Sequence, residues 1–306
     1  MLCPETKGHE MGSVNSMRIA VLGLGKMGSA MALRLERVGF DLTVWNRTRS
    51  RAEELGIGMV ADTPAAAVRG VDLVLSSLTG PDAVRDVYRG PDGAAQGASG
   101  QLFVDVSTTG PDVVFEMDPV LRAHGSPLVD APVLGTVTAV ESGSLVVLVG
   151  GAEPDVVRAR PVLEALGEMH HVGGLGSGAR LKLVANSMLG LISVGGAELL
   201  AAGERSGLDR EAVFSILARY APNLEGRRKG YVEGRHSPAM FAIRDMLKDL
   251  DLGLCLFQRA GAPVPLTALV RELVAETAQA DASLDLSAVA TRYAPPLPQR
   301  SGAGRR

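Results

Sequence analysis

The feature that most limits what this chain can fold into is an apolar run that leads directly into a glycine-rich turn. Arg18 to Leu22 suits a buried parallel strand, a G-x-G-x-x-G motif follows at once, and a helical pattern continues to Gly39. In this setting the glycines give a tight turn, close approach of a pyrophosphate and close helix packing, while the helix N-terminus attracts phosphate. The motif predicts a dinucleotide site formed by Gly23, Leu24, Gly25, Lys26, Met27 and Gly28.

The end of the second predicted strand indicates which dinucleotide is bound. An NAD-selective site usually has an acidic residue here to bind the ribose, but after Asp41–Trp45 this chain has Asn46, then Arg47 and Thr48. An arginine can pair with a 2′-phosphate through charge-assisted hydrogen bonds. We therefore predict that Asn46, Arg47 and Thr48 bind the cofactor, with NADP(H) preferred and NAD(H) possible. Arg49 and Arg51 fit this role or a solvated helix start equally well.

Strands and helices alternate through the first half of the chain. This order predicts an α/β fold with a doubly wound, mainly parallel sheet of the Rossmann type. Ligands bind such sheets at the carboxyl ends of the strands. We therefore expect one cleft to be lined by the segment after Asp130 and by Ser77, Leu78, Ser107 and Thr108.

The second half of the chain is predicted to be all helical. The expected domains are an extension at residues 1–16, a dinucleotide-binding domain at 17–178, a helical domain at 179–290 and a disordered tail at 291–306. The expected helices are Leu181–Gly207, Arg210–Tyr220, Ala239–Ala260 and Leu266–Gln279.

Composition narrows the class of protein. A net charge of −3 gives no electrostatic case for nucleic acid, and 46% hydrophobic with 4% aromatic residues is typical of a soluble α/β enzyme. The two cysteines form no disulfide or metal motif, so a reducing cytoplasm fits best. The pair His170-His171 has no third ligand nearby, so we interpret it as structural. The uncharged run Leu183–Ala197 is too short for a membrane span.

The stretch from Gly176 to Glu198 places two polar residues in an otherwise apolar or small run. Lys182 and Asn186 are four residues apart, so on a helix both side chains emerge on one face. We hypothesise that this helix joins the two domains and presents both residues to a substrate. The alternative is a core helix whose lysine extends to the surface.

Taken together, these motifs resemble the β-hydroxyacid dehydrogenase family, which includes 3-hydroxyisobutyrate dehydrogenase and semialdehyde reductases. The resemblance covers roughly residues 18–290. Its elements are the glycine-rich turn with Met31-Ala32, the segment Val44–Thr48, the substrate motif Asp130–Thr136 with Ala139, Gly143 and Leu145, the spacing of Gly176, Gly178, Lys182 and Asn186, and Lys248-Asp249-Leu250.

The resemblance implies an enzyme with a Rossmann domain, an interdomain helix and a helical domain that forms a homodimer or homotetramer. It assigns acid–base catalysis to Lys182, substrate orientation to Asn186, and positive charge near the nicotinamide to Lys248. Ser107 and the backbone at Gly135 and Thr136 would hold a substrate carboxylate. On pattern alone, Lys248 fits a solvated helix face better.

The chain departs from the family pattern in the substrate motif. Leu134 replaces the usual serine, and Thr136 and Thr138 replace glycines. Leu134 removes a hydroxyl and adds bulk, so a larger or less acidic carbonyl substrate remains open. Two alternatives also remain: an imine reductase of the same architecture, which usually has Asp or Tyr in place of Lys182, and a non-catalytic NADP-binding module.

Overall fold

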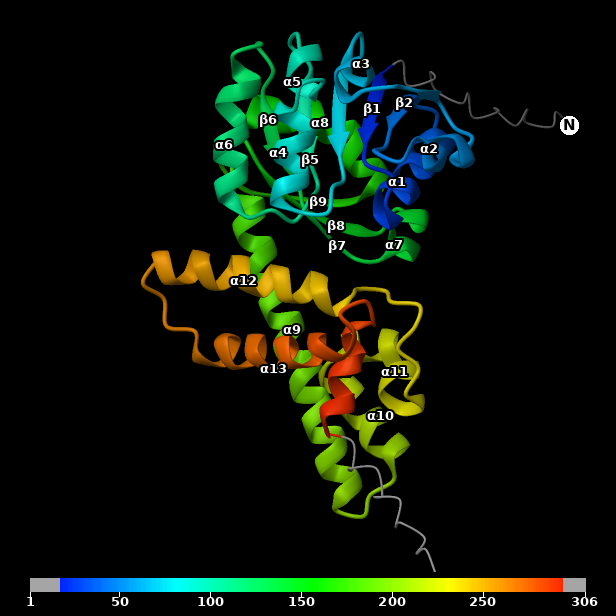
Figure 1. Ribbon diagram of the computed structural model, residues 1–306, viewed down its shortest axis with the longest axis vertical. Coiled ribbons are helices and arrows are strands. Elements are labelled where there is room, and N and C mark those ends of the chain that lie inside the picture. Colours follow the sequence, from blue (N-terminus) through cyan, green and yellow to red (C-terminus); the bar gives the residue numbers. More distant parts are fainter. Residues whose placement is uncertain (1–16, 294–306) are drawn as a thin grey trace, which may run out of the picture. The chain divides into compact units, whose positions relative to one another are not determined.

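The computed structural model describes residues 17–293, and the chain divides into two compact units between Lys182 and Leu183 (Figure 1). The predicted extension at residues 1–16, and residues 294–306 of the predicted tail, lie outside the described part. The first unit contains a nine-stranded sheet and the second is built from helices, which confirms the predicted α/β fold.

The sheet has the strand order β3-β2-β1-β4-β5-β6-β8-β7, and β9 pairs with β8. Within the described residues six strand pairings are parallel and two, β6 with β8 and β7 with β8, are antiparallel. The strands are β1 (Arg18–Leu22), β2 (Asp41–Trp45), β3 (Met59–Val60), β4 (Leu73–Ser76), β5 (Leu102–Asp105), β6 (Leu128–Asp130), β7 (Val133–Leu134), β8 (Leu145–Gly150) and β9 (Gly167–Gly173).

Helices cover both faces of this sheet, because alternate residues of each buried strand face opposite cores. Ile19 and Val21 of β1 belong to the core shared with α1 and α8, whereas Ala20 and Leu22 belong to the core shared with α3 to α6. The helices of this unit are α1 (Lys26–Arg37), α2 (Arg49–Leu55), α3 (Pro64–Val68), α4 (Pro81–Arg89), α5 (Ala94–Gly97), α6 (Pro111–Arg122), α7 (Val137–Ser142) and α8 (Glu153–Leu166).

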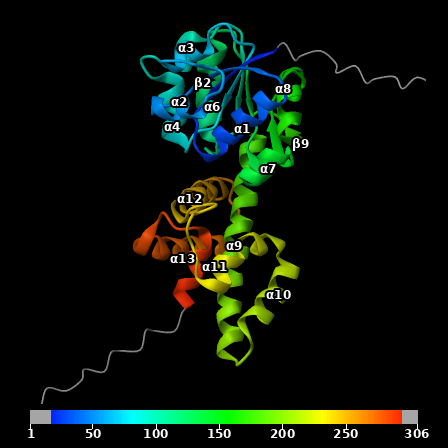
Figure 2. The same cartoon turned by 90° about the vertical axis from the view of Figure 1, so that its right-hand side faces the viewer.

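The second unit has its own apolar core and, within the described residues, no strand beyond an isolated bridge between Ala242 and Asp285. Figure 2 shows its helices from a second side. Its elements are α9 (Ser177–Arg205), which begins in the first unit, α10 (Arg210–Tyr220), the 3-10 helix η1 (Pro222–Arg227), α11 (Arg228–Glu233), α12 (Ile243–Arg259), α13 (Pro265–Asp281) and the 3-10 helix η2 (Leu286–Tyr293).

Helix α9 is longer than its uncharged run, which corrects the length argument made from the sequence. By length and composition its 29 residues are enough to cross a membrane, yet half of its most apolar window is buried inside the protein. The core helix of a soluble protein meets the same criterion, so this feature is weak evidence for a membrane span.

Candidate active site

The glycine-rich turn after β1 has two glycines that the protein itself requires and one that it does not. A Cβ on Gly23, whose φ is +95°, would lie 2.4 Å from the carbonyl oxygen of Ser77, and a Cβ on Gly28 would lie 2.0 Å from that of Gly23. A Cβ on Gly25 would have no atom within 4 Å. The open space at Gly25 therefore fits a dinucleotide phosphate, which needs a bare backbone to approach closely.

Helix α1 begins directly after Gly25, so its first backbone N–H groups belong to the same turn. Gly25 precedes the helix and gives no side-chain cap, so the donors of the first turn are free of a capping side chain. Leu24 N–H instead donates to Asn46 Oδ1 (3.0 Å), and Asn46 Nδ2 donates to the carbonyl oxygen of Thr48 (2.9 Å). Asn46 thus ties the glycine-rich turn to the loop after β2.

The arginines after β2 differ in what they contact. Arg49 donates to Glu53 (2.7 Å) and also pairs with Asp62, which binds its guanidinium to the protein. Arg47 and Thr48 are exposed, and no ion pair of Arg47 occurs among the described residues. Arg47 is therefore the better placed of the two arginines to meet a phosphate.

A row of residues in register crosses the carboxyl ends of four strands: Ser76 of β4, Asp105 of β5, Asp130 of β6 and Gly150 of β8. The first three face the core shared with α3 to α6, because they alternate with residues of the opposite core. Ser76, Asp105 and Asp130 are at most 3% exposed. Ser76 and Asp105 were not predicted as candidate site residues, although a polar residue that ends an apolar strand is a usable signal.

Asp105 is the centre of a buried hydrogen-bond network. Its Oδ1 accepts from Ser76 Oγ (2.7 Å), Ser107 Oγ (2.6 Å) and Ser107 N–H (3.2 Å). Ser107 Oγ in turn accepts from the Leu78 N–H (2.9 Å). Burial raises the pKa of Asp105, and the hydrogen bonds from Ser107 and Ser76 oppose that rise. The network brings together the predicted site residues Leu78 and Ser107.

Asp130 holds the beginning of α9. Its two carboxylate oxygens accept from the backbone N–H groups of Gly176 (2.6 Å) and Ala179 (2.7 Å). A Cβ on Gly150 would lie 2.5 Å from Asp130 Oδ1, so the end of β8 needs glycine here. Burial raises the pKa of Asp130 to about 6, although the hydrogen bonds from Ala179 and Gly176 lower it. This capping explains why α9 starts at Ser177, ahead of the predicted Leu181.

Lys182 lies one turn further along α9. Its half-buried ammonium donates to the backbone carbonyl oxygen of Val133 (2.8 Å). Val133 and Leu134 form β7, and Gly135 and Thr136 follow directly. A Cβ on Gly135, whose φ is +136°, would lie 2.6 Å from Leu145 Cδ2. Lys182 thus donates a hydrogen bond to β7, within the predicted substrate motif Asp130–Thr136.

The helical unit gathers the other two predicted polar residues around one carboxylate. Asn186 Nδ2 donates to Asp249 Oδ2 (2.5 Å), and Lys248 Nζ donates to Asp249 Oδ1 (2.5 Å). Asn186 and Asp249 are 4% and 1% exposed, whereas the Lys248 side chain is 28% exposed. Lys248 therefore does not lie on a fully solvated face. Asp249 was not singled out from the sequence, although it follows Lys248 in the same motif.

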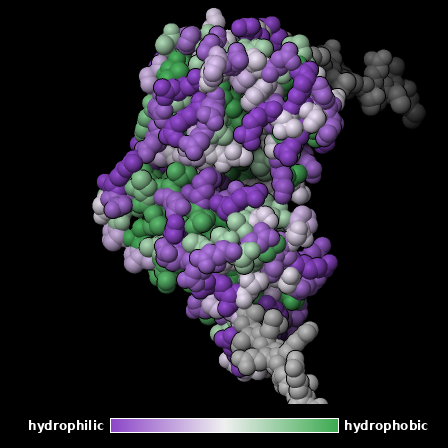
Figure 3. Space-filling view, in the orientation of Figure 1, coloured by the Kyte–Doolittle hydropathy of each residue, from purple (hydrophilic) through white to green (hydrophobic). Residues whose placement is uncertain are grey.

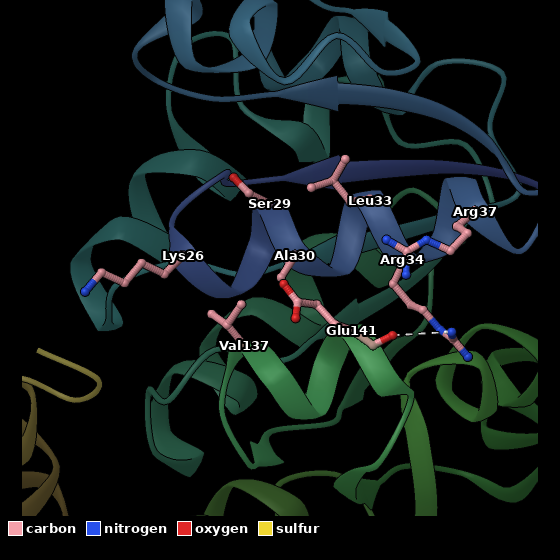
Figure 4. Close-up of a pocket in the computed structure, with 8 residues that line it drawn as sticks. All are labelled: Lys26, Ser29, Ala30, Leu33, Arg34, Arg37, Val137 and Glu141. Carbon is pink, nitrogen blue, oxygen red and sulfur yellow. Dashed lines mark hydrogen bonds between the residues drawn. The ribbon is translucent and has the colours of Figure 1, made fainter. Parts of the chain in front are cut away.

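A separate pocket of about 230 Å³ lies between α1 and α7 (Figure 4). Lys26 is the one predicted site residue that lines it. Arg34 lines the pocket and donates to the carbonyl oxygens of Ala165 (3.0 Å) and Glu141 (3.5 Å). The lining residues are Lys26, Ser29, Ala30, Leu33, Arg34, Arg37, Val137 and Glu141.

Comparison with known proteins decides the family. Residues 18–174 match the NAD binding domain of 6-phosphogluconate dehydrogenase, and residues 176–293 match the NAD-binding domain of NADP-dependent 3-hydroxyisobutyrate dehydrogenase. The 3-hydroxyisobutyrate dehydrogenase of Pseudomonas aeruginosa is 34% identical, over 90% of this chain and 98% of the relative. The chain belongs to the β-hydroxyacid dehydrogenase family. It is an NAD(P)-binding hydroxyacid dehydrogenase.

Other relatives agree with this assignment of the dehydrogenase. Glyoxylate/succinic semialdehyde reductase 2 of Arabidopsis thaliana is 31% identical, over 88% of this chain and 76% of the relative. A solved 3-hydroxyisobutyrate dehydrogenase of Mycobacterium tuberculosis is similar with a TM-score of 0.81 and 28% identity, over 92% of this chain and all of that one. An imine reductase of Myxococcus stipitatus, at a TM-score of 0.61 and 21% identity, shares the fold alone, over 91% of this chain and 99% of that one.

Proposed function

We propose that this dehydrogenase transfers hydride between NADP(H) and a hydroxy acid or its semialdehyde, with Lys182 as the general acid and base. The observation that carries this proposal is the hydrogen bond that holds the Lys182 ammonium on the Val133 carbonyl. This hydrogen bond supports the proposal because it holds an ammonium within the substrate motif Asp130–Thr136, in the same unit as the glycine-rich turn.

The reaction requires the protein to position a group that accepts or donates one proton. Hydride transfer is the chemistry that a bound nicotinamide would supply. When the alcohol is oxidised, Lys182 takes the hydroxyl proton; in reduction it donates a proton to the carbonyl oxygen as hydride arrives. The Lys182 ammonium carries three N–H donors, and the Val133 carbonyl oxygen accepts from one of them.

The other predicted residues take supporting roles in this proposal. The turn Gly23–Gly28 and Ser77, Leu78 and Thr108 bind the dinucleotide, while Ser107 and the backbone of Gly135 and Thr136 contact the substrate. The hydrogen bonds of Asn186 and Lys248 to buried Asp249 support a fixed position for both groups. We propose that Asn186 orients the substrate and that Lys248 adds positive charge beside the nicotinamide.

The catalytic proposal is tested by turnover of a panel of semialdehydes, glyoxylate, hydroxy acids and cyclic imines with NADPH or NADH. We expect Lys182→Ala to lower kcat by about 100-fold or more, because general acid–base catalysis contributes on the order of 10² to 10⁴. Lys229→Ala, a matched change at an exposed lysine, should leave kcat unchanged. A Lys182→Ala enzyme of full activity contradicts the proposal.

The same panel separates the two alternatives. Turnover of imines alone would favour an imine reductase, for which Leu134 in place of a serine is the supporting feature. Tight NADPH binding without turnover of any compound would favour a binding module. Retention of Lys182 and Asn186 argues against a module, which needs neither side chain.

The preference for NADP(H) is a separate proposal that rests on Arg47. Arg47 is exposed, while Arg49 is bound by Glu53 and Asp62. We expect Arg47→Ala to raise the NADPH dissociation constant about tenfold, because a charge-assisted hydrogen bond contributes on the order of 1.5 kcal/mol. NADH affinity should not change, and Arg219→Ala, at an exposed arginine of α10, is the matched control. An unchanged NADPH constant in Arg47→Ala would show that this arginine does not bind the 2′-phosphate.

We also propose a cytoplasmic homodimer or homotetramer that pairs through the helical unit and binds neither membrane nor nucleic acid. Large apolar side chains are exposed along that unit, among them Met188, Leu199, Leu266 and Leu269, and Figure 3 shows hydrophobic patches on its surface. Light scattering of the purified chain measures the oligomeric state. A monomer at micromolar concentration would contradict this proposal.

A further inference from the structure

The Asp105 network fixes the direction of every hydrogen bond in it. A serine or tyrosine hydroxyl has one proton to donate and two lone pairs that accept. Ser76 gives its proton to Asp105 Oδ1, so the Tyr88 hydroxyl, 2.7 Å from Ser76 Oγ, must donate to Ser76. On the other side Leu78 N–H donates to Ser107 Oγ, and Ser107 donates to the same Asp105 oxygen. Two chains of donors thus converge on one carboxylate oxygen.

These directions determine which hydrogen bond the Ser107 hydroxyl can still make to a ligand. Its only hydroxyl proton goes to Asp105 at 2.6 Å, and one lone pair takes the Leu78 N–H. One lone pair remains, so Ser107 Oγ accepts a hydrogen bond and donates none. A substrate carboxylate is an acceptor only, and placing it there would set two acceptors against each other beside Asp105.

We infer that Ser107 is a hydrogen-bond acceptor for a donor group of the bound ligands, and that Asp105 is the positioning residue that makes it so. The donor is either the carboxamide N–H of the nicotinamide or the hydroxyl of the alcohol substrate. The inference rests on the proposed placement of Ser107 in the substrate and cofactor site. It replaces the carboxylate contact expected for Ser107, and the substrate carboxylate is then held by other groups.

The cofactor arm of the test requires no turnover. Binding is followed through Trp45, the only tryptophan of the chain, at the end of β2. If the carboxamide is the donor, wild type binds NADP⁺ about tenfold more tightly than its 3-acetylpyridine analogue, in which a methyl group replaces the amide nitrogen, and Ser107→Ala removes that difference. If the wild-type enzyme binds NADP⁺ but turns over no substrate, the proposed function is wrong. The binding comparison can still support the inference about Ser107 in that case.

The substrate arm compares an alcohol with its carbonyl form. If the alcohol hydroxyl is the donor, Ser107→Ala raises the KM of the hydroxy acid about tenfold and leaves the KM of the matching semialdehyde unchanged. Malonate, which at neutral pH offers only hydrogen-bond acceptors, tests the alternative in which Ser107 donates to a substrate carboxylate. Tenfold weaker inhibition of Ser107→Ala by malonate would overturn the inference. A Ser107→Ala enzyme with an unchanged preference for NADP⁺ over its analogue and an unchanged KM for the hydroxy acid would overturn it too.

Two variants test the role of Asp105. Asp105→Leu frees the Ser107 proton and leaves its remaining lone pair, so malonate inhibition should strengthen several-fold while the donor ligand is still bound. Tyr88→Phe is the matched control: it removes the far end of the network and keeps the bond from Ser107 to Asp105, so every constant should stay at its wild-type value. If Asp105→Leu does not fold, the Ser107→Ala result still decides; if Tyr88→Phe behaves as Ser107→Ala does, the inference is wrong.

Discussion

We expect the carboxylate of Asp130 to make the stability of this enzyme depend on pH in a direction opposite to that of most carboxylates. Asp130 is 1% exposed, and burial raises its pKa from 3.8 to about 6. Between these values the folded chain binds more protons than the unfolded chain. The free energy of unfolding therefore falls as pH rises through this window.

The size of this change in unfolding free energy follows from the pKa shift of Asp130. One pKa unit corresponds to about 1.4 kcal/mol, so a rise from 3.8 to about 6 costs on the order of 3 kcal/mol when Asp130 is fully ionised at pH 7. This cost is absent below pH 3.8. Asp130→Asn is neutral at every pH and keeps an oxygen for one of the two backbone donors, Gly176 N–H or Ala179 N–H.

The assay is urea unfolding of wild type and Asp130→Asn at several pH values from 4.5 to 7.5. We expect the unfolding free energy of wild type, minus that of the variant, to fall by about 2 kcal/mol across this range, because about 1 kcal/mol of the total is already lost at pH 4.5. A constant offset from the lost helix cap does not change that slope. A difference that rises with pH would refute the reasoning, because it would mean that the capping bonds outweigh burial.

Further predictions concern the glycines and the polar contacts of the site. Gly28→Ala places a Cβ 2.0 Å from the Gly23 oxygen and should cost about 1 to 3 kcal/mol of unfolding free energy, measured in urea. Gly25→Ala meets open space, so stability should hold within about 0.5 kcal/mol while NADP⁺ affinity falls; retained affinity would show that no phosphate comes close. Asp249→Ala leaves the buried Asn186 amide without its acceptor and should cost about 1 to 3 kcal/mol; an unchanged midpoint in urea would contradict that contact.

Much of the fold could be predicted because its signals are local. The apolar run before Gly23 and the helical pattern after it identify β1 and α1, and strand–helix alternation gives the parallel sheet. The antiparallel pairing of β6 and β7 with β8 left no such signal, since β7 has only two residues. The predicted helix Ala239–Ala260 starts later, at Ile243, because Asp285 binds the N–H groups of Met240 and Phe241.

The site was predictable to the extent that it follows motifs. The turn at Gly23 and the spacing of Lys182 and Asn186 are visible in the sequence, and the structure adds the partners that hold them. The contacts of Asp105 with Ser107 and of Asp249 with Asn186 join residues that are far apart or carry no spacing pattern of their own. The direction of a hydrogen bond, which decides what Ser107 offers, depends on such contacts and cannot be read from residue types.

The anchor of Lys182 also bears on how substrate preference can change over evolution. The ammonium is held by a main-chain carbonyl, which every amino acid at position 133 supplies equally. Replacement of side chains at Leu134, Thr136 and Thr138 therefore leaves that acceptor in place. The side chains of this segment can therefore diverge while Lys182, the proposed catalytic residue, keeps its hydrogen bond.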